Sequence, residues 1–342
     1  MSLVSVYCQF DPLEEVWLGD CYPAEFYHDY KPAVKDVFER LTDITRTDLD
    51  KLHTTLTSLG VRVRRPVFTN NVNDYLDANG NLLKPPIAPR DNEMALANNF
   101  YHLRSPFKID PWQSAIDEYA ASGAHVILAQ FIEPFGCIIP ASVVRVGKDL
   151  YIDYDSHAHS WHIIEQHVLP TWRQDFNVHV CHTDGHADGV FCAVGTGRIL
   201  TSHWKHDYSS EFPGWDVFHL AYQKSKYESQ LNRLNLTKNK NWWAEGFVQQ
   251  YPAFNQHIEE YAVDWIGYAT ETVYEVNALM VNEHLILTTG IPSIDTQEWF
   301  KKHKVEWIPI EFRARGFWDS GIHCLTVDVR RQGSNRKIVS CE

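Results

Sequence analysis

A pattern of two strands, one helix and a third strand recurs along this 342-residue chain and constrains its fold more than any other feature. Residues 141–155 form two alternating apolar runs separated by 147–149, which have the composition of a hairpin turn. Apolar residues at helical spacing follow over 160–172, and residues 176–183 return as a strand. This unit is therefore a hairpin joined to a third strand by a crossover helix.

The same order of elements predicts four further units. Hairpin, helix and strand succeed one another over residues 273–312 and, with weaker alternation, over residues 91–130. Another unit opens at 188–202, and a helical insertion at about 207–268 enlarges its helical part. The fifth unit is divided between the two ends of the chain, with strands at 14–20 and 321–331, a helix at 36–60 and a last strand at 61–66.

A repeat whose last unit is shared between both termini predicts a closed ring. We therefore expect one α/β domain over residues 1–342, a five-bladed α/β propeller of ββαβ units. A two-domain α/β sandwich is the alternative, because hairpins inferred from a single sequence are often misassigned.

The composition limits the class of partner. A net charge of −13 argues against wrapping nucleic acid or anionic lipid, because both need a basic surface. No run of eighteen apolar residues predicts a membrane span, and the first residues do not resemble a signal peptide. The seven cysteines are scattered and contain no CxxC pair, which is typical of reduced thiols in the cytoplasm.

Polar residues at the starts of strands are candidates for a site, because strand starts converge on the axis of such a ring. Cys324 precedes an alternating apolar run and so lies at the entrance of a strand. A free cysteine is usually a core residue, whereas a thiolate with a nearby histidine would be a nucleophile. His323 is adjacent, and in an extended strand it would point to the opposite face, which makes it a poor proton shuttle.

The stretch from 182 to 188 admits three interpretations. His182, Asp184, His186 and Asp188 alternate, so on an extended segment they would share one face and could bind a metal. Alternatively, His186 is a general acid/base and Asp188 orients it or binds a cationic substrate. The third interpretation is a polar loop.

Arg90 and Asp91 form a short loop before a strand. A surface ion pair is the simpler interpretation of these two residues. If Asp91 faces the centre of the ring, its carboxylate can instead hold a guanidinium group through paired hydrogen bonds.

Six blocks of sequence resemble the amidinotransferases, the family of glycine amidinotransferase and the inosamine-phosphate amidinotransferases. They follow one another in the order that the family has, from one end of the chain to the other. The most specific is the last, "GIHCLTVDVRRQG". The blocks are residues 10–20, 59–66, 89–91, 143–152, 186–191 and 321–333.

The resemblance implies the five-bladed propeller and gives roles to the candidates. Cys324 would attack the central carbon of a guanidino group, His186 would be the acid/base, and Asp188 and Asp91 would be carboxylates of the site. The implied reaction is ping-pong transfer of an amidino group from an arginine-like donor to an amine acceptor. It requires no cofactor and no metal, and family habit suggests a homodimer.

The resemblance also implies that Arg90 binds substrate. The departures from the family pattern all concern the substrate pocket. Ser142 stands where the glycine enzymes have an aspartate, and Lys205 lies where the family has an arginine that grips a substrate carboxylate. A lysine is a poorer match for that role than a guanidinium fork. Glu271 replaces one of a pair of serines and would restore the missing carboxylate.

Three other functions remain open at the level of sequence. A guanidine hydrolase would use the same cysteine and histidine with water as the acceptor. A metallohydrolase would use His182, Asp184 and His186. A protein that binds a guanidino compound without consuming it would explain the loss of the aspartate at Ser142.

Overall fold

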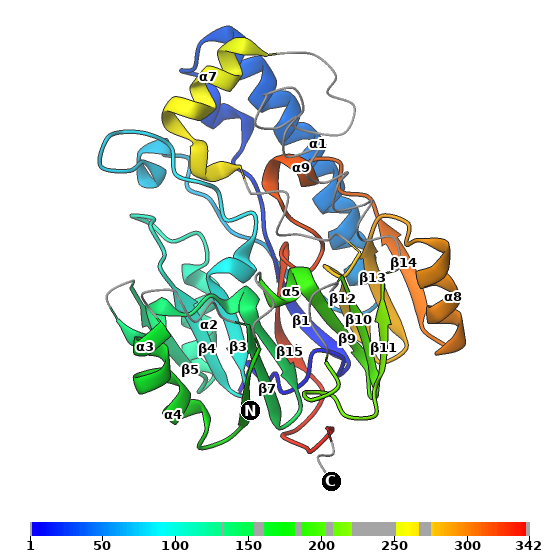
Figure 1. The fold of residues 1–342 in the computed structure, drawn as a ribbon. Helices are drawn as coiled ribbons and strands as arrows, with labels where there is room; N and C mark the ends of the chain where they lie inside the picture. Colours follow the sequence, from blue (N-terminus) through cyan, green and yellow to red (C-terminus); the bar gives the residue numbers. More distant parts are fainter. Residues whose placement is uncertain are drawn as a thin grey trace.

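Five three-stranded sheets stand side by side in the computed structural model, which describes residues 2–130, 133–153, 161–181, 186–202, 208–220, 251–266 and 275–339 (Figure 1). Each sheet contains one repeat unit, and the order of units around the molecule follows the sequence. The five-bladed α/β propeller expected from the repeat is therefore confirmed.

The four internal sheets share one topology. The first two strands form an antiparallel hairpin, and the third strand lies parallel to the second. The hairpin of residues 141–155, for example, pairs Val143 with Ile152, and Ile152 then pairs with Val180. The strands are β3 (Glu93–Leu96), β4 (Asn99–Leu103), β5 (His125–Ala129); β6 (Val143–Val146), β7 (Asp149–Asp153), β8 (Asn177–Cys181); β9 (Phe191–Gly195), β10 (Arg198–Thr201), β11 (Asp216–His219); and β12 (Leu279–Asn282), β13 (Leu285–Thr289), β14 (Glu306–Ile310).

The remaining sheet joins the two ends of the chain. β15 (Thr326–Arg331) lies antiparallel to β1 (Leu13–Leu18), and β1 lies parallel to β2 (Arg62–Arg64). The repeat therefore closes on itself through the pairing of its first and last strands.

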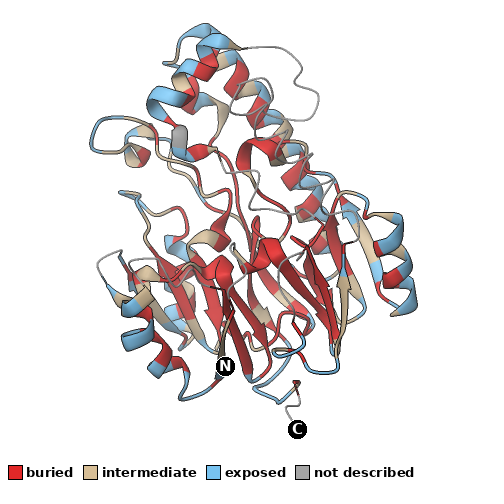
Figure 2. Ribbon diagram, viewed as in Figure 1, coloured by how far each residue is buried: buried red, intermediate tan, exposed pale blue. Residues whose placement is uncertain are grey.

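In every sheet except the fourth, a described helix connects to the third strand and leaves its exposed residues on the outside (Figures 1 and 2). Between β10 and β11 of the fourth sheet, the described residues contain turns and no helix. α2 (Gln113–Ala121) and α8 (Ile294–Lys302) are single helices, and the Ser293 side chain caps α8 by accepting a hydrogen bond from the Thr296 backbone. The crossover of the third sheet consists of α3 (Trp161–Ile163), a π-helical turn (Ile164–Val168) and α4 (Leu169–Trp172).

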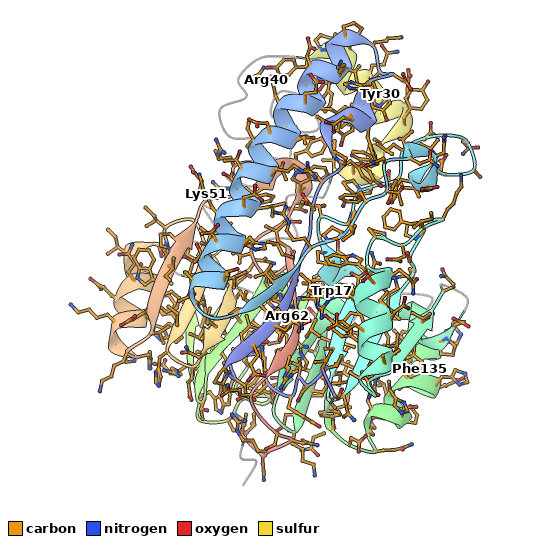
Figure 3. All side chains as sticks on the ribbon, turned by 180° about the vertical axis from the view of Figure 1, so that it is seen from behind. Trp17, Tyr30, Arg40, Lys51, Arg62 and Phe135 are labelled. Carbon is orange, nitrogen blue, oxygen red and sulfur yellow. The ribbon has the colours of Figure 1, made fainter. Side chains whose placement is uncertain are left out.

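The longest helix belongs to the sheet that joins the termini. α1 (Pro32–Ser58) extends past the sheets, and α7 (Pro252–Tyr261) packs on the extension (Figures 1 and 3). The rings of Phe38 and Phe254 lie 4.8 Å apart, and Arg40 donates a hydrogen bond to the Tyr251 hydroxyl. Among the described helices, none combines the length and the apolar character needed to cross a membrane.

The helical insertion was expected to begin at about residue 207, but residues up to 219 still belong to the fourth sheet. Residues Asp216–His219 form β11, which lies parallel to β10 with Arg198 opposite Asp216, so the fourth sheet is complete before residue 220. A strand of four residues among aromatic residues gives little alternation, so the sequence pattern does not reveal β11. Residues 221–250, including the tryptophan pair, lie outside the described part of the chain.

An ionic cluster at the middle of the ring holds several units together. Asp328 of β15 accepts hydrogen bonds from Arg90 (2.8 Å), Arg145 (2.7 Å) and Arg331 (2.7 Å), and all four side chains are buried. Burial alone would raise the pKa of Asp328, but the three guanidinium groups hold it well below its usual range. Arg331 also donates to the Met280 carbonyl on β12, which links the first and fifth sheets.

Candidate active site

Cys324 lies in a helical turn that ends where β15 begins. The Leu325 backbone donates to the Gly321 carbonyl at 3.1 Å, and the Thr326 backbone donates to the His323 carbonyl at 3.0 Å. The thiol is buried, and its sulfur lies 3.3 Å from Asp188 Oδ2. The sequence thus indicated the position of Cys324 at a strand entrance correctly, but the residues before the strand are not extended.

The expectation that His323 points away from the site is wrong. His323 Nδ1 lies 2.9 Å from Asp188 Oδ2, the oxygen that also contacts Cys324. Adjacent side chains in a helical turn diverge by about 100°, rather than the half-turn of a strand, so both reach the same carboxylate. Burial and the nearby Arg90 keep the pKa of His323 below its usual value.

Asp188 is the central carboxylate of the site. It belongs to α5 (Ala187–Val190), a single turn that leads into β9. Burial opposes its ionised form, but the hydrogen bond from His323 and the charge of His186 lower its pKa overall. Its second oxygen, Oδ1, is buried and has no hydrogen-bond partner in the described part of the chain. An ionised carboxylate with one unpaired oxygen beside a thiol is suited to hold a cation there.

Asn277 is a site residue that the sequence analysis missed. Its Nδ2 donates to Cys324 Sγ at 2.9 Å, and its Oδ1 accepts hydrogen bonds from the backbones of His323 (3.0 Å) and Cys324 (3.1 Å). It precedes β12 by two residues and is 0% exposed. The rule that singled out the other strand starts would have found it if applied to this unit as well.

Gly321 is required by the contact with Asn277. A Cβ atom at this position would lie 2.5 Å from Asn277 Oδ1 and 2.7 Å from its Cβ, closer than such atoms approach. The glycine of "SGIHC" therefore lets the asparagine reach the backbone of the cysteine turn.

Asp91 and His186 act electrostatically on the same group of side chains, since the charge of His186 acts on both Asp91 and Asp188. Burial raises the pKa of Asp91, and the charge of His186 opposes that rise. The pKa of the Cys324 thiol is raised well above its usual value by burial and then by the charges of Asp188 and Asp91. The structure therefore brings these four residues into one electrostatic neighbourhood, and the thiol there is neutral at neutral pH.

Arg90 does not have the free guanidinium group expected of a substrate-binding residue. Its Nε donates to the Thr326 carbonyl at 2.9 Å, its Nη2 bonds Asp328, and the side chain is 1% exposed. Arg90 instead fixes the end of the cysteine turn against the ionic cluster. A sequence cannot distinguish such an arginine from one that faces a ligand.

Ser142, which the resemblance assigns to the substrate pocket, lies at the start of the third sheet. It is buried in the turn Pro140–Ser142, which packs against both the turn of Asp91 and α5. Lys205 and Glu271 lie outside the described residues, as do His182 and Asp184 of the metal hypothesis. In the part of the chain that the structure describes, no three histidine, cysteine or acidic side chains are grouped as metal ligands.

Comparisons with solved structures give the class of the fold. An amidinotransferase of the saxitoxin biosynthetic pathway from Microseira wollei superposes with a TM-score of 0.66 at 16% identity, covering 98% of this chain and 99% of that chain. The inosamine-phosphate amidinotransferase of Streptomyces griseus gives 0.65 at 18%, covering 99% and 100%. A dimethylarginine dimethylaminohydrolase of Pseudomonas aeruginosa gives 0.53 at 9%, covering 92% and 99%. The chain therefore has the pentein fold, the five-bladed α/β propeller of these three proteins.

Comparisons with curated proteins narrow the resemblance within that class. An inosamine-phosphate amidinotransferase of Streptomyces glaucescens is 23% identical over 98% of each chain. An L-arginine:L-lysine amidinotransferase of Pseudomonas savastanoi pv. phaseolicola is 21% identical over 97% of this chain and 95% of its own. No family model matches the chain. The resemblance to the amidinotransferases inferred from the six blocks is thus confirmed along the whole chain.

Proposed function

We propose that this protein transfers an amidino group from a guanidino donor to an amine acceptor through a covalent amidino-Cys324 intermediate. The observation that carries the proposal is the contact of Cys324 Sγ with Asp188 Oδ2 at 3.3 Å, beside the unpaired Asp188 Oδ1. A guanidinium group bound to Oδ1 would present its central carbon near the sulfur. Full-length similarity to amidinotransferases supports transfer as the reaction.

Substrate binding would itself activate the nucleophile. In the free protein the charges of Asp188 and Asp91 oppose ionisation of the Cys324 thiol. A bound guanidinium group neutralises that field, so the pKa of the thiol falls when the donor is in place. The thiol is thereby more reactive toward a bound cation than toward other electrophiles.

The first half-reaction balances with a single proton transfer. His186 accepts the thiol proton, the sulfur attacks the central carbon, and the C–N bond to the donor amine breaks as His186 returns the proton to that nitrogen. The donor leaves as a primary amine, and the amidino group remains on the sulfur. In the second half-reaction the acceptor amine gives a proton to His186 and attacks the amidino carbon, which releases the thiol.

Small molecules are the partners that this chemistry requires. The relatives are named for inosamine phosphate, for L-arginine with L-lysine, and for the saxitoxin pathway, so their substrates differ at similar overall identity. The proposed reaction uses an arginine-like guanidino donor. The acceptor of this chain is an amine whose remaining groups fit a pocket altered at Ser142.

A screen of guanidino donors against amine acceptors by mass spectrometry tests the proposal, with Cys324→Ala as the blank. We expect a new guanidino compound together with the amine derived from the donor. Release of urea, ammonia or citrulline without a new guanidino compound would instead support a hydrolase. Consumption of donor by the Cys324→Ala protein would contradict the proposal.

A further inference from the structure

A pocket of about 280 Å³ lies beside Asp91, which is one of its lining residues. Its walls are the chain around Lys84, the strand end at Arg104, and Glu93, Trp112 and Asp264. Its volume equals that of roughly nine molecules of liquid water, so it suits part of a small molecule. Asp91 is shared by the pocket and the candidate active site, whereas Cys324 and Asp188 do not line the pocket.

Several buried polar side-chain atoms of the described pocket residues have no hydrogen-bond partner, among them Glu93 Oε2, His102 Nδ1 and Trp112 Nε1. Glu93 is 5% exposed, and its Oε2 has no hydrogen-bond donor; Trp112 is 2% exposed, and its Nε1 has no acceptor. Buried polar groups are nearly always paired, because an unpaired one loses its hydration without compensation. One acceptor and one donor left unpaired in the same pocket indicate a ligand that carries a donor and an acceptor.

The two groups are held rigidly, as in a built site. Glu93 Oε1 lies 3.2 Å from His102 Nδ1, and His102 Nε2 lies 2.7 Å from Asp110 Oδ2. Asp110 Oδ1 accepts a hydrogen bond from the Trp112 backbone at 2.8 Å, and the indole ring stacks on Trp17 at 4.1 Å. The carboxylate and the indole are thus connected through one chain of contacts and cannot readily turn toward other partners.

The charges around the pocket have both signs. Lys84 and Arg104 supply cations, and Lys84 has no ion-pair partner among the described residues. Glu93 and Asp264 supply carboxylates on the same walls. A ligand with an ammonium group and an anionic group would satisfy the Glu93 oxygen with its ammonium hydrogens, and Lys84 and the indole hydrogen with its anion.

We propose that this pocket binds the end of a substrate remote from its reacting nitrogen, and that this end carries an ammonium group and an anionic group. The proposal rests on the proposed function, because it places the reacting nitrogen on the other side of Asp91. It also assigns recognition of the anionic group to Lys84, whereas the family resemblance assigns it to Lys205.

The indole resonance of Trp112 reports on the pocket directly. In ¹⁵N-tryptophan-labelled Cys324→Ala protein, with Trp112→Phe used to assign the signal, L-arginine should shift the Trp112 Nε1–H resonance in a saturable way. Guanidinium chloride, which lacks the remote end, should leave it in place. O-phosphoethanolamine and γ-aminobutyrate then show whether a phosphate or a carboxylate is the preferred anion.

Variants decide whether the pocket residues cause the shift. Glu93→Gln and Lys84→Met should each weaken L-arginine binding about tenfold or more, because each removes a charge-assisted contact. Glu298→Gln and Lys301→Met, matched changes on the exposed face of α8, should have no effect. Because Lys84 is partly exposed, Lys84→Met should fold normally. It therefore tests the pocket even if the buried substitution Glu93→Gln prevents folding.

Two results would overturn the proposal: no shift of Trp112 with L-arginine, or an unchanged affinity in both variants. The outcome is separable from that of the proposed function. An amidino adduct on Cys324 of the wild-type protein without a Trp112 shift removes only the pocket assignment. A Trp112 shift without any adduct removes only the transfer reaction.

Discussion

The amide nitrogen of Asn277 donates a hydrogen bond to Cys324 Sγ over 2.9 Å, while its amide oxygen accepts from the backbones of Cys324 and His323. One buried side chain thus holds both the candidate nucleophile and the turn that carries it. Its hydrogen bond also lowers the pKa of the thiol, against the larger effects of burial and of the carboxylates. Asn277 is therefore positioned to stabilise a thiolate at Cys324.

Asn277→Asp should separate this effect from the packing of the turn. The new carboxylate retains the shape and both backbone contacts, but it donates neither to the sulfur nor to the Asp188 carbonyl, and its negative charge further opposes ionisation of the thiol. A hydrogen bond to a charged group contributes about 1.5–3 kcal/mol, so kcat should fall about 10- to 100-fold. The pH at which iodoacetamide labels Cys324, followed by mass spectrometry, should rise. Asn282→Asp on the far end of β12 is the control, and an unshifted labelling profile in Asn277→Asp would contradict the assignment.

Asp91→Asn should make the thiol more reactive and the enzyme less active. The Asp91 carboxylate raises the pKa of Cys324, so its removal lowers that pKa and increases the thiolate fraction near neutral pH. Each unit of lowered pKa gives about tenfold more thiolate while the thiol remains mostly protonated. Iodoacetamide labelling of Cys324 at pH 7 should accelerate, whereas transfer should fall because a guanidinium group loses one of its carboxylates. Slower labelling than in the wild type would show that Asp91 does not act on the thiol.

Gly321→Ala should damage the site through Asn277. The added Cβ would lie 2.5 Å from Asn277 Oδ1, and crowding of this kind costs about 1–3 kcal/mol. Activity should be lost along with stability, because the asparagine must move away from Cys324. In Gly60→Ala the new atom meets nothing within 4 Å but the backbone has a positive φ, so that variant should lose stability and keep its kcat. Urea unfolding and kcat, measured on both, distinguish the two; full activity in Gly321→Ala would refute the argument.

Asp328→Asn should destabilise the whole ring. Three buried guanidinium groups would lose their shared carboxylate, at a cost of about 3–5 kcal/mol in the free energy of unfolding. Because the pKa of Asp328 is lowered in the folded state, this stabilisation is complete above the unfolded value near 4 and is lost only as the pH falls further. Urea unfolding at pH 7 and at pH 5 should therefore give the same difference between the two proteins.

The matched control for Asp328→Asn is Asp216→Asn. Asp216 pairs with Lys302 and His303 at the surface, where such pairs contribute less than about 1 kcal/mol. Equal destabilisation by the two substitutions would show that the central cluster does not hold the units together.

Local pattern was enough to predict the ring and the position of Cys324 at the entrance of a strand. Hairpins, crossover helices and turns all leave a periodic trace, and the split fifth unit required β1 to meet β15. The short strand β11 left no such trace, because Asp216–His219 gains its order from pairing with β10 rather than from its own alternation.

The orientation of individual side chains could not be predicted in the same way. His323 was assigned to the wrong face because the pattern of β15 was extended back into a helical turn. The sequence does not show that Arg90 is already paired, because its partner Asp328 is distant along the chain. Asn277 was overlooked because its contacts are made across the ring. Each depends on tertiary packing, which a single sequence does not encode locally.

The most direct test of the account is the mass of Cys324 during turnover. Wild-type protein mixed with a competent guanidino donor in the absence of acceptor, quenched in acid and digested, should carry one amidino group on the peptide that contains Cys324. Addition of the acceptor should remove that group and produce the new guanidino compound. Transfer that proceeds while this peptide stays unmodified, or an amidino group found on another residue, would contradict the account.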